Sequence, residues 1–252
     1  MPYLHLRQIC LVARSLEPVV SDIAAIMVLE VCYRDPHVGK YGLENALLPV
    51  GPILLEVIAP TREGTAAGRF LDKSAGRGGY MAIFSCDDPD GRAARANAMG
   101  VRTANVIDHP PYHGVQLHPR DCRAAFIEFN HTDGSDDVLG PYPPAGPDWT
   151  RAIRGDVTSA LTEIVLQSPD PASLAAHWGR ILDVAPSTDG KGVRLNLPNA
   201  EIRIEAGERE LMSGLAFRVT DVERVTDAAR AHGYAVSRGG FEIGGVTFTP
   251  VT

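Results

Sequence analysis

The sequence predicts an α+β fold made of four βαβββ repeats. In each repeat a short apolar strand is followed by a capped amphipathic helix and then by further strands. The repeats open with strands that begin at Gln8, Tyr80, Glu163 and Leu215. Because the same strand position recurs four times, corresponding residues of the repeats can be compared. This comparison indicates which strand positions are candidates for catalytic or ligand-binding residues.

Helix start signals follow each opening strand. Side chains of the N-cap type precede the predicted helices, and the first of these runs over about residues 16–27. Pro89 and Pro171 occupy first-turn positions, and Gly100 and Gly233 are expected to end two of the helices. The N-cap candidates are Ser15, Asp88, Asp170 and Asp221.

Strands fill the segments between the helices. Turn residues such as Gly51-Pro52 and Pro198-Asn199 separate apolar runs of strand length. The alternation of Gln8, Cys10 and Val12 places these three side chains on one face of the first strand. The other strands expected from these runs cover residues 53–58, 193–197 and 200–204.

A segment rich in Pro, Gly and Asp lies between the second and third repeats. It predicts two domains of two repeats each, over residues 1–132 and 157–252, joined by a linker at residues 133–156. A second Gly-rich segment, residues 61–79, is expected to be a loop between the first and second repeats.

Composition excludes several classes of protein. A net charge of −7 argues against a nucleic-acid partner, because a phosphate backbone needs a basic surface. No apolar run approaches the roughly 18 residues of a membrane span, so no membrane partner is expected. The four cysteines show no CxxC spacing, and the N-terminus shows no signal-peptide pattern. We therefore expect a cytoplasmic protein that binds a small molecule, and a homodimer is left open.

Local sequence resembles the vicinal oxygen chelate superfamily, the group of glyoxalase-like, bleomycin-resistance and extradiol dioxygenase proteins. The resemblance covers nearly the whole chain, and it implies paired βαβββ repeats with curled mixed sheets and helices outside. It implies a first domain with the candidate active site and a second, degenerate domain. The matching segments are residues 8–17, 54–60, 117–121 and 126–129.

In that superfamily a metal is bound by the first and last strands of each repeat. The resemblance places Gln8, Glu56 and Glu128 at three ligand positions and Tyr80 where a histidine is usual. A ligand set of Gln8, Glu56 and Glu128 is rich in oxygen, and it favours Mg²⁺ or Mn²⁺ over tightly held Zn²⁺. Alternatively, Tyr80 fills the hollow and no metal is bound. Each glutamate taken alone is typical of a rim charge, but the matching repeat positions favour a shared pocket.

The corresponding positions of the second domain are Glu163, Arg203, Gly214 and Phe248. This set does not provide the two histidines and one glutamate of an extradiol dioxygenase iron site, so a dioxygenase is disfavoured. We expect this domain to have a structural role.

The resemblance implies an enzyme that removes a proton next to a carbonyl of a small oxygenated metabolite, as an isomerase, epimerase or lyase. The catalytic candidates are Glu128 as base, Glu56 as its partner carboxylate, and Tyr80, or a metal, as the group that stabilises an enolate. The alternative is a metal-free protein that sequesters a small molecule, as bleomycin-resistance proteins do. The absent histidine favours this alternative.

Overall fold

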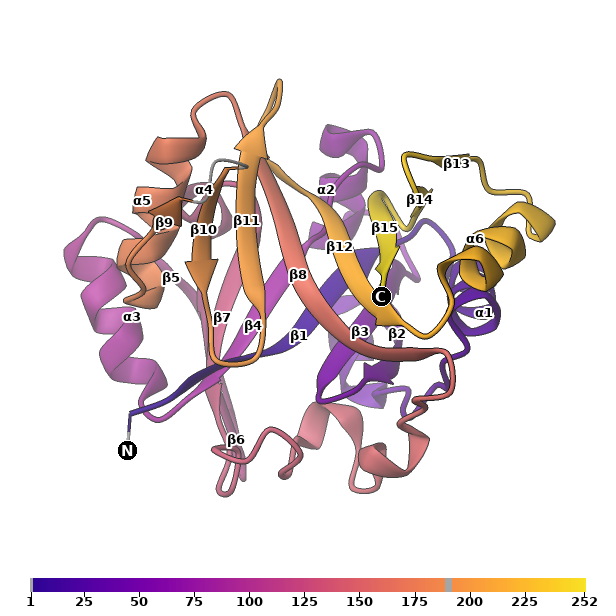
Figure 1. Cartoon of the computed structure of the whole chain (residues 1–252). Helices are drawn as coiled ribbons and strands as arrows, with labels where there is room; N and C mark the ends of the chain where they lie inside the picture. The colour runs from indigo at the N-terminus through magenta and orange to yellow at the C-terminus, as the bar shows by residue number, and fades with distance from the viewer. Residues whose placement is uncertain (1, 189–191) are drawn as a thin grey trace. The chain divides into compact units, whose positions relative to one another are not determined.

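A computed structural model describes residues 2–188 and 192–252 and confirms the α+β fold class. The strands form two mixed sheets: the seven strands between Leu4 and His131 make sheet A, and the eight strands between Thr158 and Val251 make sheet B. Three long strands, β1, β8 and β12, have the bounds Leu4–Val12, Thr158–Ser168 and Leu211–Val219. Figure 1 traces the chain through these elements.

Repeats 2, 3 and 4 have the predicted βαβββ order. In each of them the first strand pairs in parallel with the last, whereas neighbouring strands within the repeat pair antiparallel. Their elements, besides β8 and β12, are β4 (Met81–Cys86), α3 (Pro89–Ala98), β5 (Thr103–His109), β6 (Tyr112–Leu117), α4 (Pro119–Cys122), β7 (Phe126–His131), α5 (Pro171–Leu182), β9 (Ser187–Thr188), β10 (Val193–Asn196), β11 (Glu201–Ala206), α6 (Val222–Ala231), β13 (Val236–Ser237), β14 (Gly240–Ile243) and β15 (Val246–Val251).

Repeat 1 departs from the pattern. Within the described residues it has three strands, and a single bridge between Tyr33 and Leu47 stands where the fourth would lie. Asp35 and Pro36 follow this bridge and start a 3₁₀ helix, because the Asp35 side chain caps it and proline suits its first position. The elements of this repeat after β1 are α1 (Leu16–Met27), the 3₁₀ helix η1 (Pro36–Tyr41), β2 (Leu43–Val50), β3 (Ile53–Pro60) and α2 (Ala66–Ser74).

Helix α2 corrects the expectation of a loop over residues 61–79. The hydroxyl of Thr65 accepts a hydrogen bond from the Gly68 amide at 3.0 Å, and this satisfies one of the free donors of the first turn. Ala67 and Leu71, four positions apart, are both buried. A cap and one short apolar stripe are therefore enough to order a segment rich in glycine.

The caps of the other helices were largely predicted. Asp88, Asp170 and Asp221 each accept a hydrogen bond from a first-turn amide at 2.8–3.0 Å. At the first helix, Ser15 instead donates its hydroxyl to the Glu17 carbonyl, and the Glu17 carboxylate accepts from the Ser21 amide. A longer acidic side chain thus performs the capping expected of Ser15.

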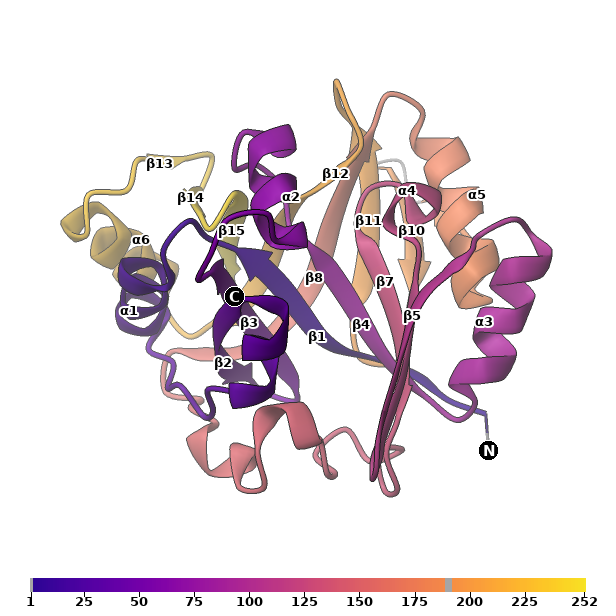
Figure 2. The same cartoon turned by 180° about the vertical axis from the view of Figure 1, so that it is seen from behind.

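By contacts, the chain groups into two compact units. The first unit contains Met1–Gln8, Met81–Pro143 and Glu163–Met212, and the second contains Ile9–Tyr80, Pro144–Thr162 and Ser213–Thr252. Helices α3 and α5 lie side by side within the first unit, and α1 and α6 lie side by side within the second (Figures 1 and 2).

Repeats 1 and 2, before the expected linker, form sheet A, and repeats 3 and 4, after it, form sheet B. The contacts instead group most of repeat 2 with repeat 3 and most of repeat 1 with repeat 4. The domain division of the sequence stays a prediction. Residues 133–156 themselves contain the 3₁₀ helices η2 (Pro143–Ala145) and η3 (Trp149–Ala152), and Tyr142, Ala145 and Trp149 are buried. Among the described residues no helix is long and apolar enough to cross a bilayer.

Candidate functional site

Glu128 lies in the middle of β7 and is 2% exposed. The Tyr112 hydroxyl donates to Glu128 Oε1, and the Gln116 side-chain amide donates to Oε2 at 2.8 Å. Both donors come from β6, the strand that pairs antiparallel with β7. Because side chains alternate along a strand, Tyr112, Gly114 and Gln116 share one face. Residues 112–114 therefore belong to a strand.

Gly114 makes room for this contact. A Cβ at Gly114 would lie 2.9 Å from the Tyr112 ring and 3.1 Å from Glu128 Oε1. Both distances are shorter than ordinary van der Waals contact, so any larger residue would push the phenol or the carboxylate away. The absence of a side chain at Gly114 therefore allows the hydrogen bond between Tyr112 and Glu128.

Tyr112 stays a neutral hydrogen-bond donor near pH 7. Burial raises its pKa well above 10, and the negative charge of Glu128 raises it further. Its ring meets the ring of Tyr142 edge to face, with centroids 6.1 Å apart.

The Tyr142 hydroxyl donates to Gln8 Oε1 at 2.9 Å, and Gln8 is 3% exposed on β1. The hydrogen bonds at Glu128 and at Gln8 are therefore connected by the contact between the two tyrosine rings, all within the first compact unit. We call Gln8, Tyr112, Gln116, Glu128 and Tyr142 the Glu128 network. It joins two of the residues predicted from the sequence with three that were not.

Glu56 and Tyr80 belong to the second compact unit. Glu56 on β3 is 7% exposed, and it accepts a hydrogen bond from the Asn45 side-chain amide at 2.6 Å. Tyr80 directly precedes β4, its ring lies edge-on to Phe70 at 5.0 Å, and burial raises its pKa to about 12. Glu56 is thus a buried strand residue, whereas Tyr80 is partly exposed just before a strand. Their convergence with Gln8 and Glu128 on one pocket stays a prediction.

The Glu128 network does not fit a metal ion in this arrangement. Gln8 Oε1 and both carboxylate oxygens of Glu128 already accept hydrogen bonds from protein donors. In the described part of the chain, no three or more His, Cys, Asp or Glu side chains are grouped as a metal site. The expected ligand set also includes Glu56 of the other unit, so it stays a prediction.

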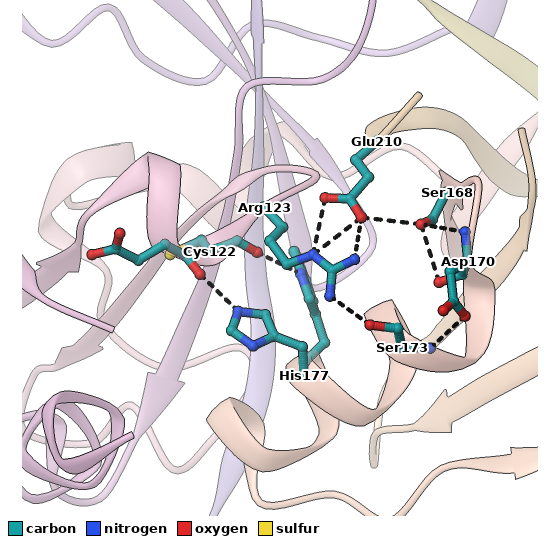
Figure 3. Close-up of polar contacts among 9 residues, drawn as sticks. Cys122, Arg123, Ser168, Asp170, Ser173, His177 and Glu210 are labelled. Carbon is teal, nitrogen blue, oxygen red and sulfur yellow. Dashed lines mark hydrogen bonds and ion pairs between the residues drawn. The ribbon is translucent and has the colours of Figure 1, made fainter. Parts of the chain in front are cut away.

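A second polar cluster in the first unit was not predicted (Figure 3). Arg123, at the end of α4, donates through Nε to both carboxylate oxygens of Glu210 at 3.0–3.1 Å. Glu210 also accepts from the Ser168 hydroxyl at 3.0 Å, and Arg123 donates to the Ser173 hydroxyl at 3.1 Å. These contacts tie the end of repeat 2 to repeat 3.

The backbone at this cluster is strained and the cluster is part-buried. Arg123 has φ 71° and ψ −125°, a region that favours glycine. His177 on α5 donates from Nε2 to the Asp121 carbonyl at 2.7 Å, and burial lowers the pKa of His177. Because these side chains are satisfied by one another, we assign the cluster a structural role.

Of the three network residues that were not predicted, two leave a signal in the sequence and one does not. Tyr112 and Gln116 show a period of two with Gly114, a signal that predicts a strand face. Tyr142 lies in a proline-rich segment without periodicity, so no local signal indicates it. Only the folded chain brings it to Gln8.

No protein-family model matches the chain, and no curated protein matches it. A protein of Staphylococcus aureus described as hypothetical matches over 98% of this chain and 99% of its own, with a TM-score of 0.66 at 13% identity. That likeness shows the fold alone. Two methylmalonyl-CoA epimerases also match, and each alignment covers 50% of this chain. The Streptomyces coelicolor enzyme does so at 25% identity over 96% of its length, and the Mycobacterium tuberculosis enzyme at 20% over 87%. Their TM-scores are 0.45.

Proposed function

We propose that the protein is a glyoxalase-like enzyme that removes a proton next to a carbonyl of a small oxygenated molecule, with Glu128 as the base. The observation that carries this proposal is the setting of Glu128, a carboxylate that is buried and held by two neutral donors, Tyr112 and Gln116. A base of this kind acts best when water is kept away and its orientation is set by its neighbours.

In the proposed reaction the C–H bond next to the carbonyl breaks and its proton moves to Glu128. The electron pair moves onto the carbonyl oxygen, which becomes an enolate. Protonated Glu128 no longer needs the Tyr112 hydrogen, so Tyr112, neutral because its pKa is raised, turns its hydroxyl hydrogen from Glu128 to that oxygen, while Gln116 keeps the carboxyl group oriented. Return of the proton to carbon gives an isomer or epimer, and loss of a neighbouring group gives a lyase product.

Glu56 and Tyr80 are proposed as a second carboxylate and a second phenol for the same reaction. Glu56 would carry the proton that returns to the substrate carbon, and Tyr80 would donate a hydrogen bond to the enolate. This part of the proposal predicts that Glu56→Gln slows proton return more than proton removal, so its effect on epimer formation exceeds its effect on deuterium uptake.

Deuterium uptake from solvent tests the proposal without a known product. A panel of 2-hydroxy ketones, 2-hydroxy acids and 2-substituted acyl thioesters in D₂O would be followed by proton NMR. We expect uptake at the carbon next to the carbonyl with at least one compound. Glu128→Gln should reduce the rate about 100-fold or more, because loss of a general base typically has an effect of 10² to 10⁴. Glu63→Gln, at an exposed loop position, is the matched control.

A metal-free binding protein is the second candidate. The favouring observation is that the polar atoms of the Glu128 network are already hydrogen-bonded to one another, as in a binding surface that needs no reactive group. Saturable binding of a small aromatic compound, measured by calorimetry, without deuterium uptake by any member of the panel, would favour this candidate over the enzyme.

A further inference from the structure

The segment from Thr132 to Tyr142 follows the last strand of sheet A, and its composition is typical of a linker. The structure nevertheless buries its last residue, because Tyr142 is 2% exposed. A tyrosine of this burial usually has its hydroxyl paired, and here the partner is Gln8. The segment therefore contributes a side chain to the Glu128 network.

Arg7 holds this segment in place. It is the residue before Gln8 on β1, it is 1% exposed, and its guanidinium donates to the carbonyls of Val138 and Gly140, the latter at 2.8 Å. The guanidinium carbon also lies 4.8 Å from the centre of the Tyr142 ring, which is cation–π distance. A buried arginine needs partners for its charge, and here two backbone carbonyls and an aromatic face provide them.

We infer that Arg7 and Tyr142 are positioning residues of the Glu128 network, and that the segment between Thr132 and Tyr142 is part of the site rather than a linker. The inference deepens the proposed function, on which its catalytic part rests. Arg7 seats the segment, and Tyr142 then sets the orientation of the Gln8 amide and of the Tyr112 phenol.

The geometry explains how the two residues act. Because the Tyr142 hydroxyl donates to Gln8 Oε1, the carboxamide of Gln8 has its oxygen turned toward the phenol and its NH₂ group turned away. The edge of Tyr142 against Tyr112 restricts rotation of that ring and keeps its hydroxyl on Glu128 Oε1. Neither function requires Tyr142 to touch a substrate.

Tyr142→Phe tests the orientation of Gln8, because it keeps the ring and its contact with Arg7 and removes only the hydroxyl. We expect the side-chain amide protons of Gln8, followed by ¹⁵N NMR and identified by their loss in Gln8→Glu, to exchange with water at least tenfold faster. The kcat of deuterium uptake should fall at least tenfold with KM unchanged. Tyr41→Phe, at an exposed tyrosine, should change neither quantity.

Arg7→Met tests whether Arg7 holds the segment from Thr132 to Tyr142 in place, because methionine keeps much of the side-chain volume and removes the hydrogen-bond donors. Leu139 is 50% exposed and provides a thermolysin site within the segment. We expect cleavage at Leu139 to be at least tenfold faster in Arg7→Met than in the unchanged protein, and unaffected in Arg120→Met, an exposed arginine of the same unit.

Unchanged Gln8 amide exchange in folded Tyr142→Phe, or an unchanged cleavage rate in folded Arg7→Met, would overturn the inference. If Arg7→Met does not fold, the amide exchange in Tyr142→Phe decides. Both readouts are independent of catalysis. Absence of deuterium uptake with every compound would therefore count against the proposed function, while the amide and protease results would still decide the positioning roles.

Discussion

The Tyr142 hydroxyl donates a hydrogen bond to Gln8 Oε1 at 2.9 Å across 134 residues of sequence. This bond joins a strand at the start of the chain to a segment that local sequence marks as a linker. The Tyr142 ring packs against Tyr112, whose hydroxyl donates to Glu128, so one buried network contains the proposed base and two phenols. The predictions below test how this network and the Arg123 cluster hold together.

Tyr112→Phe should destabilise the protein by about 1–3 kcal/mol, because it leaves a buried carboxylate with one hydrogen bond fewer. Urea unfolding of the variant and of Tyr41→Phe measures the difference, and the control should stay within about 0.5 kcal/mol of the unchanged protein. A loss below this limit for Tyr112→Phe would show that another donor replaces the phenol at Glu128.

Gly114→Ala should destabilise by about 1–3 kcal/mol, because its methyl group would overlap with the Tyr112 ring and crowd Glu128 Oε1. The matched control is Gly155→Ala, at an exposed glycine with no atom within 4 Å of an added Cβ. Thermal melting compares the two variants. Equal melting temperatures would mean that Tyr112 and Glu128 move aside at little cost in stability. A glycine would then not be required at position 114.

The Arg123–Glu210 pair should make stability depend on pH. The hydrogen bond from Arg123 lowers the pKa of Glu210 below its ordinary value. A lowered folded-state pKa gives stability that is present above the unfolded pKa, about 4.3, and is lost as pH falls through the lower, folded value. The melting temperature should therefore drop more steeply on acidification below that point in the unchanged protein than in Glu210→Gln.

The control for that experiment is Glu208→Gln, at an exposed glutamate two residues away. Its acid dependence should follow that of the unchanged protein. Parallel curves for Glu210→Gln and Glu208→Gln would indicate that the ion pair adds nothing measurable, as is common for part-exposed pairs.

Metal binding is tested by titration with Zn²⁺ and Mn²⁺ in a calorimeter. We expect no tight binding by the unchanged protein, because phenol hydroxyls already donate to Gln8 and Glu128. Tyr80→His should increase affinity for Zn²⁺ if Tyr80 lies at the predicted ligand position, since a neutral imidazole is a much better ligand than a phenol. Tyr41→His controls for an added histidine, and tight stoichiometric Zn²⁺ in the unchanged protein would contradict the expectation.

Local features of the sequence determined the secondary structure well. Asp88, Asp170 and Asp221 cap the helices they precede, because a cap depends on residues three positions apart. The family resemblance indicated Gln8 and Glu128 as candidate site residues, and both are buried strand residues in the structure. Residues 61–79 contain α2 although their glycine content predicts a loop. One cap and a short apolar stripe are enough to form the helix.

Tertiary structure decided which polar groups meet. Tyr142 reaches Gln8, and Arg123 reaches Glu210 87 residues away, through contacts that no local spacing encodes. The physical reason is that hydrogen bonds between distant segments depend on how sheets and loops pack, whereas caps and alternation depend on neighbours along the chain. The sequence alone therefore determined the repeated α+β architecture and indicated Gln8 and Glu128 as candidate site residues, and folding decided that Tyr142 and Tyr112 donate hydrogen bonds to them.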